Sequence, residues 1–263
     1  MCLIFFLYEQ HPVYRLALAA NRDEYYERPT QALGFWEDSP NILAGRDLKQ
    51  SGTWMGITRN GRFAAITNFR DPASLKPDAP SRGLLISDFL AGNTSPERCL
   101  EEIQSVGYRY NGFNLLLGDH AELFYYSNRA DGFRKIKPGL YGLSNHLLNT
   151  PWHKVEKGMA ELEIALSEEQ AEEHIDIEAI FRILADGTRP PDDRLPNTGV
   201  GIEWERILSP IFVSSETYGT RSSSVLLIKR NGEVTFAERT FAPENQGGNT
   251  EHETRIFRMM LEK

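Results

Sequence analysis

The chain has 263 residues and a mass of 29.9 kDa, enough to bury a core without disulfides or metals. Its net charge of −8 arises in residues 161–178, which hold eight acids and no Lys or Arg, so no basic nucleic-acid footprint is present. The two cysteines, Cys2 and Cys99, lack metal-ligand spacing, which predicts a reducing, cytoplasmic location with neither a disulfide nor a metal site.

The first eight residues are apolar, but no basic stretch precedes them and no small-residue cleavage site follows, so they do not fit a secretory signal. No segment reaches the roughly 18 apolar residues that a membrane span needs. We therefore expect no membrane span and no nucleic-acid partner. The expected partner is a small-molecule ligand or substrate, and the sequence leaves the oligomeric state open.

Strand patterns open the chain. Residues 2–8 and 14–20 predict two strands, and the unbroken apolar run of the first is typical of an interior strand. Asn60-Gly61 separates two further strand-like runs, which predicts a hairpin with a two-residue type I′ turn. Residues 81–106 predict two helices, the second with Ser95 as its N-cap.

The middle of the chain again predicts strands followed by helices. Residues 113–136 predict three short strands. Two helices are predicted after Pro151, with apolar stripes over residues 155–166 and 177–184. Each stripe is one-sided, so each helix is expected to pack on a sheet or on the other helix.

A long stretch rich in Pro, Gly and Asp follows at residues 186–204, and we interpret it as a surface loop of the kind that forms lids or binding elements. Asn231-Gly232 then predicts a second hairpin like the first. This order of strands and helix blocks predicts one α+β domain over residues 1–263, in which helices cover the faces of β-layers.

Cys2 is the first candidate for chemistry. Removal of Met1 is favoured when the next residue is small, and it would leave Cys2 with both a thiol and a free α-amine. Their ordinary pKa values, about 8.5 and 7.7–8.0, let the amine accept the proton of the thiol near neutral pH. The alternative is that Met1 stays and Cys2 merely begins a strand, and intact mass distinguishes the two.

Four polar residues, Asn21 to Glu24, follow the second predicted strand. In a hairpin, this point lies close to the Cys2 end. A cation such as Arg22 would lower the pKa of the thiol, and a carboxylate such as Asp23 could hold the amine. The alternative is a surface turn stabilised by its own ion pairs.

Further candidates sit at strand ends. Asn68 and Asn145 each follow a strand-like run, where an amide NH2 can donate to a developing oxyanion or simply cap a turn. Arg221 directly precedes a buried strand, either as a functional cation or as an ordinary strand-entry charge. His146 and His153 could meet a haem or could be polar turn residues.

With Cys2 in front, three segments resemble the NRDE-motif family, which includes the transport and Golgi organization 2 proteins. They are "NRDE" (21–24), "GLSNHLLNTPWHKV" and "YGTRSSSVLL". That family is similar to the N-terminal nucleophile (Ntn) hydrolases of the Cys-type choloylglycine hydrolase kind. The resemblance therefore implies a four-layer αββα sandwich.

The resemblance also implies roles for single residues. By this resemblance, Cys2 is the nucleophile and base, and Arg22 and Asp23 are the pair that tunes it. Asn68 and Asn145 are amides that donate to the oxyanion or orient the amine, and Arg221 supports the thiolate. Substrate contacts fall to Asn21, Glu24 and His146. The amidases separate their Arg and Asp by two residues, whereas Arg22 and Asp23 are adjacent here, so both reach Cys2 only if the strand has already ended.

Two functions follow as expectations. The first is hydrolysis of a small amide through a thioester on Cys2, without a cofactor. The second is a non-catalytic carrier for haem, acyl-CoA or lipid that uses the same pocket, because the family has been linked to haem trafficking and to acyl-CoA handling. The sequence contains no CxxCH haem-attachment motif.

Overall fold

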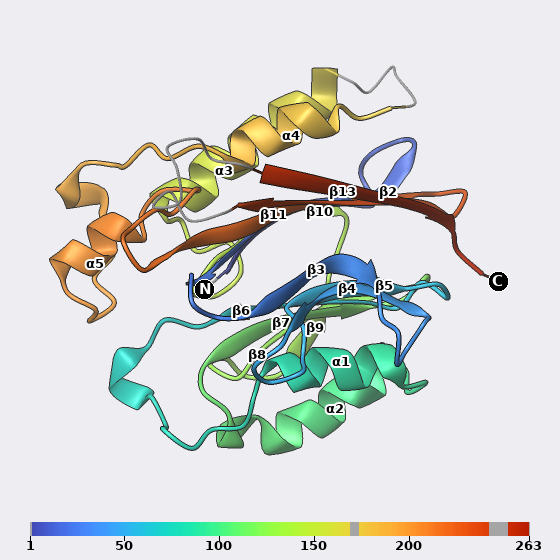
Figure 1. Ribbon diagram of the computed structural model, residues 1–263, viewed down its shortest axis with the longest axis horizontal. Helices are drawn as coiled ribbons and strands as arrows, with labels where there is room; N and C mark the ends of the chain where they lie inside the picture. Colours follow the sequence, from blue (N-terminus) through green and yellow to red (C-terminus); the bar gives the residue numbers. More distant parts are fainter. Residues whose placement is uncertain (1, 169–173, 242–251, 263) are drawn as a thin grey trace. The chain divides into compact units, whose positions relative to one another are not determined.

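The computed structural model describes residues 2–168, 174–241 and 252–262 (Figure 1). The chain forms two compact units, each built on one antiparallel sheet. The first unit comprises Met1–Glu27, Lys137–Ser144 and Leu148–Met259, and the second comprises Arg28–Ile136, Asn145–Leu147 and Met260–Lys263. The predicted α+β class, with two antiparallel sheets and helices, is confirmed.

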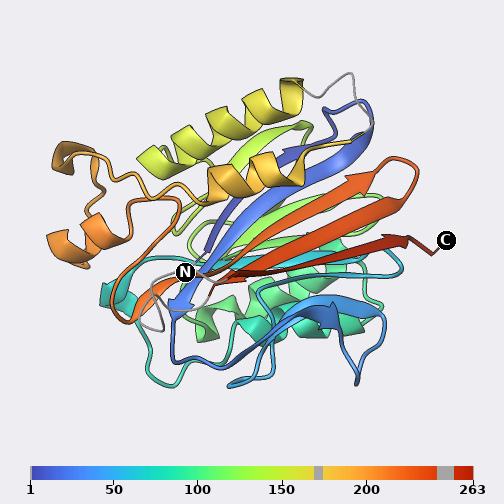
Figure 2. The same ribbon diagram turned by 45° about the horizontal axis from the view of Figure 1, so that its top comes forward.

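The first unit contains a six-stranded sheet in the order β10-β1-β2-β11-β12-β13. The strands are β1 (Cys2–Tyr8), β2 (Tyr14–Tyr25), β10 (Gly139–Leu143), β11 (Tyr218–Lys229), β12 (Glu233–Phe241) and β13 (His252–Met260). Helices α3 (His153–Glu168) and α4 (Ile177–Leu184) cover one face of this sheet (Figure 2). Their apolar stripes meet Leu3, Phe5 and Val225 in one buried core, as the stripes predict. Because β1 pairs with β10 and β2, it is the interior strand that its apolar run predicts.

The second unit contains a seven-stranded sheet in sequence order from β3 to β9. The strands are β3 (Thr30–Phe35), β4 (Ile42–Asp47), β5 (Met55–Thr58), β6 (Phe63–Asn68), β7 (Phe113–Gly118), β8 (Leu123–Ser127) and β9 (Phe133–Lys135). Helices α1 (Gly83–Ala91) and α2 (Pro96–Val106) pack on one face of it. The predicted N-cap of α2 is confirmed, since Ser95 Oγ accepts the Arg98 amide at 3.4 Å.

Short helical segments complete the chain: 3₁₀ turns η1 (Pro72–Ser74), η2 (Gly107–Arg109) and η3 (Asp192–Arg194), and helix α5 (Ile202–Ile207). The predicted loop over residues 186–204 therefore contains η3 and ends inside α5. Strands β3, β4 and β13 have no counterpart in the sequence prediction, whereas β10 is the strand-like run that precedes Asn145. Among the helices of the described residues, none is long and apolar enough to cross a bilayer.

The two Asn-Gly hairpins form, but the predicted turn type is wrong. A type I′ turn needs positive φ at both central residues, and here only the glycines have it, Gly61 at 82° and Gly232 at 92°. In the first hairpin, the Thr58 amide donates to Arg62 O at 2.9 Å, so three residues connect the strands and the glycine is the left-handed one.

Candidate functional site

Cys2 belongs to a row of side chains that crosses three strands of the first unit. It lies directly opposite Arg22 in the β1–β2 ladder, and Arg22 lies directly opposite Ser222 in the β2–β11 ladder. Directly opposed residues present their side chains on the same face of a sheet. The next opposed pair, Leu3 and Asn21, faces the helices instead, where Leu3 joins the core. Cys2, Arg22 and Ser222 therefore share the face that α3 and α4 do not cover.

Two further charged groups lie beside this row. Glu24 follows Arg22 by two residues, so it shares the same face, and its Oε2 lies 4.0 Å from Arg22 Nη2. Arg221 occupies a bulge of β11 and donates from Nη1 to the backbone oxygens of Tyr25 (2.9 Å) and Tyr26 (3.0 Å). Arg221 thus lies inside β11, whereas the sequence placed it ahead of the strand.

We name Cys2, Arg22, Glu24, Arg221 and Ser222 the Cys2 cluster. Burial lowers the pKa of Arg221, the positive charge of Arg22 lowers that pKa further, and Glu24 opposes both. The cluster therefore holds two guanidinium groups against one carboxylate. Ser222 is buried, and its Oγ has no hydrogen-bond partner among the described residues. The sequence analysis missed Ser222, because one Ser in a Ser-Ser-Ser run carries no signal of its own.

Asp23 points to the opposite face. The predicted end of the second strand at residue 20 is wrong, because β2 continues to Tyr25 and alternation therefore holds through the NRDE residues. Asp23 is buried, and its Oδ1 accepts a hydrogen bond from Thr220 Oγ1 at 2.8 Å. Tyr218 Oη donates to Asp23 O at 2.9 Å. Asp23 thereby ties β2 to the start of β11.

Asn21 lies inside the first unit. Its Nδ2 donates to Leu184 O (2.8 Å) and Ile211 O (2.9 Å), and its Oδ1 accepts from Ser223 Oγ (2.6 Å). The amide thus closes the end of α4 and anchors the sheet to the helical layer. This position, on the face away from Cys2, does not support the expected substrate contact.

The environment of the Cys2 thiol has opposing effects. Burial raises its pKa, and the negative charges of Asp23 and Glu24 raise it further, whereas the positive amino terminus and Arg22 lower it. Arg22 lowers the thiol pKa, as the sequence predicts, but the net direction is upward because desolvation outweighs the guanidinium. Both Arg22 and Asp23 therefore act on Cys2 through their charges, although only Arg22 shares its face.

The remaining predicted residues form a separate group in the second unit. Asn68 ends β6, and Asn145 Nδ2 donates to Asn68 O at 2.9 Å. Arg70, which the sequence analysis did not single out, donates its amide to Asn145 O at 2.7 Å and its Nη2 to Asn145 Oδ1 at 3.4 Å. The His146 ring packs on Phe69 at 4.8 Å, and burial lowers the pKa of His146. One hydrogen of the Asn145 amide is thus already used within the protein.

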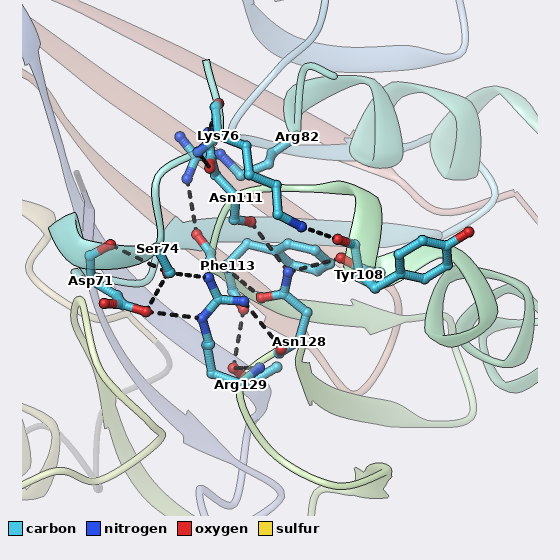
Figure 3. A network of polar contacts seen from close by, with 12 residues as sticks. Asp71, Ser74, Lys76, Arg82, Tyr108, Asn111, Phe113, Asn128 and Arg129 are labelled. Carbon is cyan, nitrogen blue, oxygen red and sulfur yellow. Dashed lines mark hydrogen bonds and ion pairs between the residues drawn. The ribbon is translucent and has the colours of Figure 1, made fainter. Parts of the chain in front are cut away.

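A polar network holds the loop that follows Arg70 (Figure 3). Arg129 Nη2 donates to Ser74 Oγ at 2.7 Å, and Arg129 Nε lies 3.4 Å from Asp71 Oδ2. Asn111 exchanges two hydrogen bonds with the backbone of Lys76, at 2.7 and 3.1 Å. These bonds join residues 71–76 to the loops before β7 and after β8, so the loop that follows Arg70 is held at both ends.

The predicted site residues thus gather in two groups, one within each unit. Cys2, Arg22, Glu24 and Arg221 lie together in the first unit, whereas Asn68, Asn145 and His146 lie together in the second. His153 is the first residue of α3. Among the described residues, no three His, Cys, Asp or Glu side chains are arranged to hold a metal ion.

These features define an α+β protein with a half-buried cysteine at the start of an interior strand, beside an arginine–carboxylate group. The chain belongs to the Transport and Golgi organisation 2 family, whose model matches residues 1–243. The resemblance drawn from the NRDE segments is confirmed.

Curated relatives agree with this family. The mouse Transport and Golgi organization 2 homolog (Mus musculus) is 36% identical over 260 residues, which cover 91% of this chain and 93% of the relative. The human homolog (Homo sapiens) is 34% identical over 282 residues, which cover both chains fully at 100%. The similarity therefore spans nearly the whole of each protein.

Among solved structures, the chain is similar to a conjugated bile acid hydrolase mutant from Clostridium perfringens (TM-score 0.46, 10% identity, covering 97% of this chain and 96% of the hydrolase). It is also similar to the Caenorhabditis elegans ortholog of N-acylethanolamine-hydrolyzing acid amidase (TM-score 0.48, 7% identity, covering 86% of this chain and 92% of the amidase). At these levels the likeness carries no argument about activity or substrate.

Proposed function

We propose that this protein hydrolyses the C–N bond of a small amide with Cys2 as the nucleophile. The observation that carries the proposal is the direct opposition of Cys2 and Arg22 on one face of an interior strand pair, with Glu24 bound to Arg22. A rigid strand holds a nucleophile in a defined position, which lowers the entropic cost of attack. The adjacent guanidinium stabilises the thiolate as it forms.

The reaction has two steps. In the first, the Cys2 sulfur forms a C–S bond with the amide carbonyl carbon, the C–N bond breaks, and the amine leaves with the proton that the thiol gave up. In the second, water attacks the thioester, the C–S bond breaks, and a carboxylic acid and the free thiol are released. No oxidant or reductant is needed, because the sequence is an acyl transfer followed by hydrolysis.

Because the pKa of the Cys2 thiol is raised, the reaction needs a general base. Burial keeps the thiol protonated near neutral pH, so a group must accept its proton during the attack. After loss of Met1, the α-amine of Cys2 supplies that base on the same residue. The proposal therefore requires removal of Met1.

A matched pair of variants tests the proposal. N-acyl amides of increasing acyl length are incubated with the wild type, with Cys2→Ala and with Cys99→Ala, and the released amine is measured. We expect turnover in the wild type and in Cys99→Ala, and none above background in Cys2→Ala. Equal turnover in Cys2→Ala would refute the nucleophile assignment.

Two observations favour a second candidate, a carrier without turnover for haem, acyl-CoA or lipid. The Cys2 thiol is held in its neutral form by burial, and one hydrogen of the Asn145 amide is occupied by Asn68 O. A thermal-shift series with haem and acyl-CoAs tests this candidate, together with a search for a Soret band. Binding that persists in Cys2→Ala, without amide turnover in the wild type, would favour the carrier.

A further inference from the structure

Among the described residues, no strand pairs with the outer edge of the six-stranded sheet of the first unit. Strand β13 is the last in the order, and Figure 2 shows it in dark red as the outermost strand of its sheet. Seven of its nine residues are exposed and the other two are half-buried. Ile256 is 45% exposed and Met260 is 59% exposed. A strand of this length spans about 30 Å and offers its outer N–H and C=O groups to another strand.

β13 carries three charged side chains, Glu253, Arg255 and Arg258, but it lacks other devices that keep edge strands apart. Its sequence, HETRIFRMM, contains no Lys, Pro or Gly. The opposite edge of the same sheet is protected differently, since β10 is only five residues long and includes Gly139 and Gly142. The two edges are therefore not equivalent, and β13 is the one suited to pairing.

We propose that β13 pairs antiparallel with β13 of a second copy of this chain, so that the two sheets join across a two-fold axis. An axis normal to the sheet keeps each residue on its own face, so opposed residues must be an even number of positions apart. Because β13 runs from residue 252 to residue 260, a centre at Ile256 pairs all nine residues. Any other centre leaves part of the strand unpaired.

The side chains fit this register. Ile256 meets its own copy at the axis, which covers two exposed apolar side chains. Outward from the axis, the opposed pairs are Arg255–Phe257, Thr254–Arg258, Glu253–Met259 and His252–Met260. No like charges are opposed, and the Arg255–Phe257 pair allows a cation–π contact on each side.

The charge pattern excludes one neighbouring register, and the number of paired residues favours Ile256 over the others. A centre at Arg255 would oppose two arginines directly, which is destabilising. In the proposed register, each Arg255 lies opposite Phe257, and its Nε lies 2.8 Å from Glu253 Oε1 of its own strand. This self-match favours a second copy over an unrelated peptide as the occupant of the edge.

Sedimentation velocity of the full chain over a range of concentrations tests the interface. We expect a dimer for the wild type. Ile256→Lys opposes two ammonium groups at the axis and should raise the dimer Kd by at least about tenfold. Ile164→Lys is the matched control: Ile164 lies on α3 and is also exposed, at 56%. A monomeric wild type, or an Ile256→Lys dimer of unchanged Kd, would overturn the proposal.

A covalent probe separates loss of the interface from loss of the strand. In a Cys2→Ala and Cys99→Ala background, Ile256→Cys should form a disulfide-linked dimer under mild oxidation, because residue 256 meets its own copy. Ile164→Cys should not. A dimer that Ile256→Cys fails to link would overturn the proposed register.

Discussion

The close packing of α3 on β1 leads to a prediction about Gly158. A Cβ placed on Gly158 would lie 2.0 Å from Phe5 Cζ and 2.4 Å from Phe5 Cε2, and Phe5 is fully buried. Ordinary carbon contacts are about 3.5–4.0 Å, so the helix or the ring would have to move by roughly 1.5 Å. Because Phe5 lies three residues after Cys2 on β1, this contact also helps to hold the strand that carries the nucleophile.

Two opposing contributions determine how much Gly158→Ala changes the free energy of unfolding. Replacing a helical glycine with alanine gains about 1 kcal/mol of helix propensity. Overpacking a core costs about 1–3 kcal/mol, and a contact this short belongs at the upper end. We therefore expect a net loss of about 2 kcal/mol, which lowers the melting temperature by roughly 4–8 °C in a chain of this size.

Thermal unfolding followed by circular dichroism measures this change. Gly187→Ala is the control, because a Cβ there would meet nothing closer than Phe212 O at 4.0 Å. Phe5→Leu should relieve the crowding, so the double variant Phe5→Leu/Gly158→Ala should be more stable than the sum of the single effects implies. A Gly158→Ala protein as stable as the wild type would refute the packing of α3 on β1 described above.

Three further predictions concern titration and capping. Burial lowers the pKa of His11 and of His146, so below about pH 6.5 the unfolded chain binds more protons and the free energy of unfolding should fall from pH 7 to pH 5, measured by urea denaturation. Burial raises the pKa of Cys99 to about 11, so peptide mapping should find Cys99 almost unalkylated after iodoacetamide treatment at pH 7. Ser95→Ala should lower stability by about 1 kcal/mol through loss of the α2 N-cap, whereas Ser105→Ala within the helix should be close to neutral in the same urea experiment.

Local signals account for what could be predicted from the sequence. Each of these signals depends on residues only a few positions apart. Examples are the apolar run at residues 2–8, the N-cap at Ser95 and the apolar stripes of α3 and α4. Such patterns identify helices and strands because a buried face requires apolar residues at a regular spacing, and a helix end requires a capping residue. Helices α1 to α4 and most interior strands follow from them, whereas α5 does not.

Long-range partners explain what could not be predicted. The NRDE residues appear to end a strand because they are polar, yet Asp23 and Asn21 are satisfied by Thr220 and Ser223, about 200 residues away. The bulge that turns Arg221 toward Tyr25 and Tyr26 likewise exists only once β2 and β11 are paired. No pattern within one segment contains this information.

Edge strands are equally hard to recognise from the sequence. β13 is exposed on both faces, so its sequence shows no alternation of apolar and polar residues. The pKa of Cys2 was beyond prediction for a related reason. The charges of Arg22 and Asp23 were visible in the sequence, but the burial that outweighs Arg22 depends on the folded chain.

Mass spectrometry of the acylated protein tests the central claim most directly. The protein is incubated with an activated N-acyl amide, quenched in acid, and mapped by peptide. The account predicts an amino-terminal peptide that begins at Cys2 and carries the acyl group as a thioester. A chain that keeps Met1 in every molecule, or an acyl group found only on another residue, would contradict it.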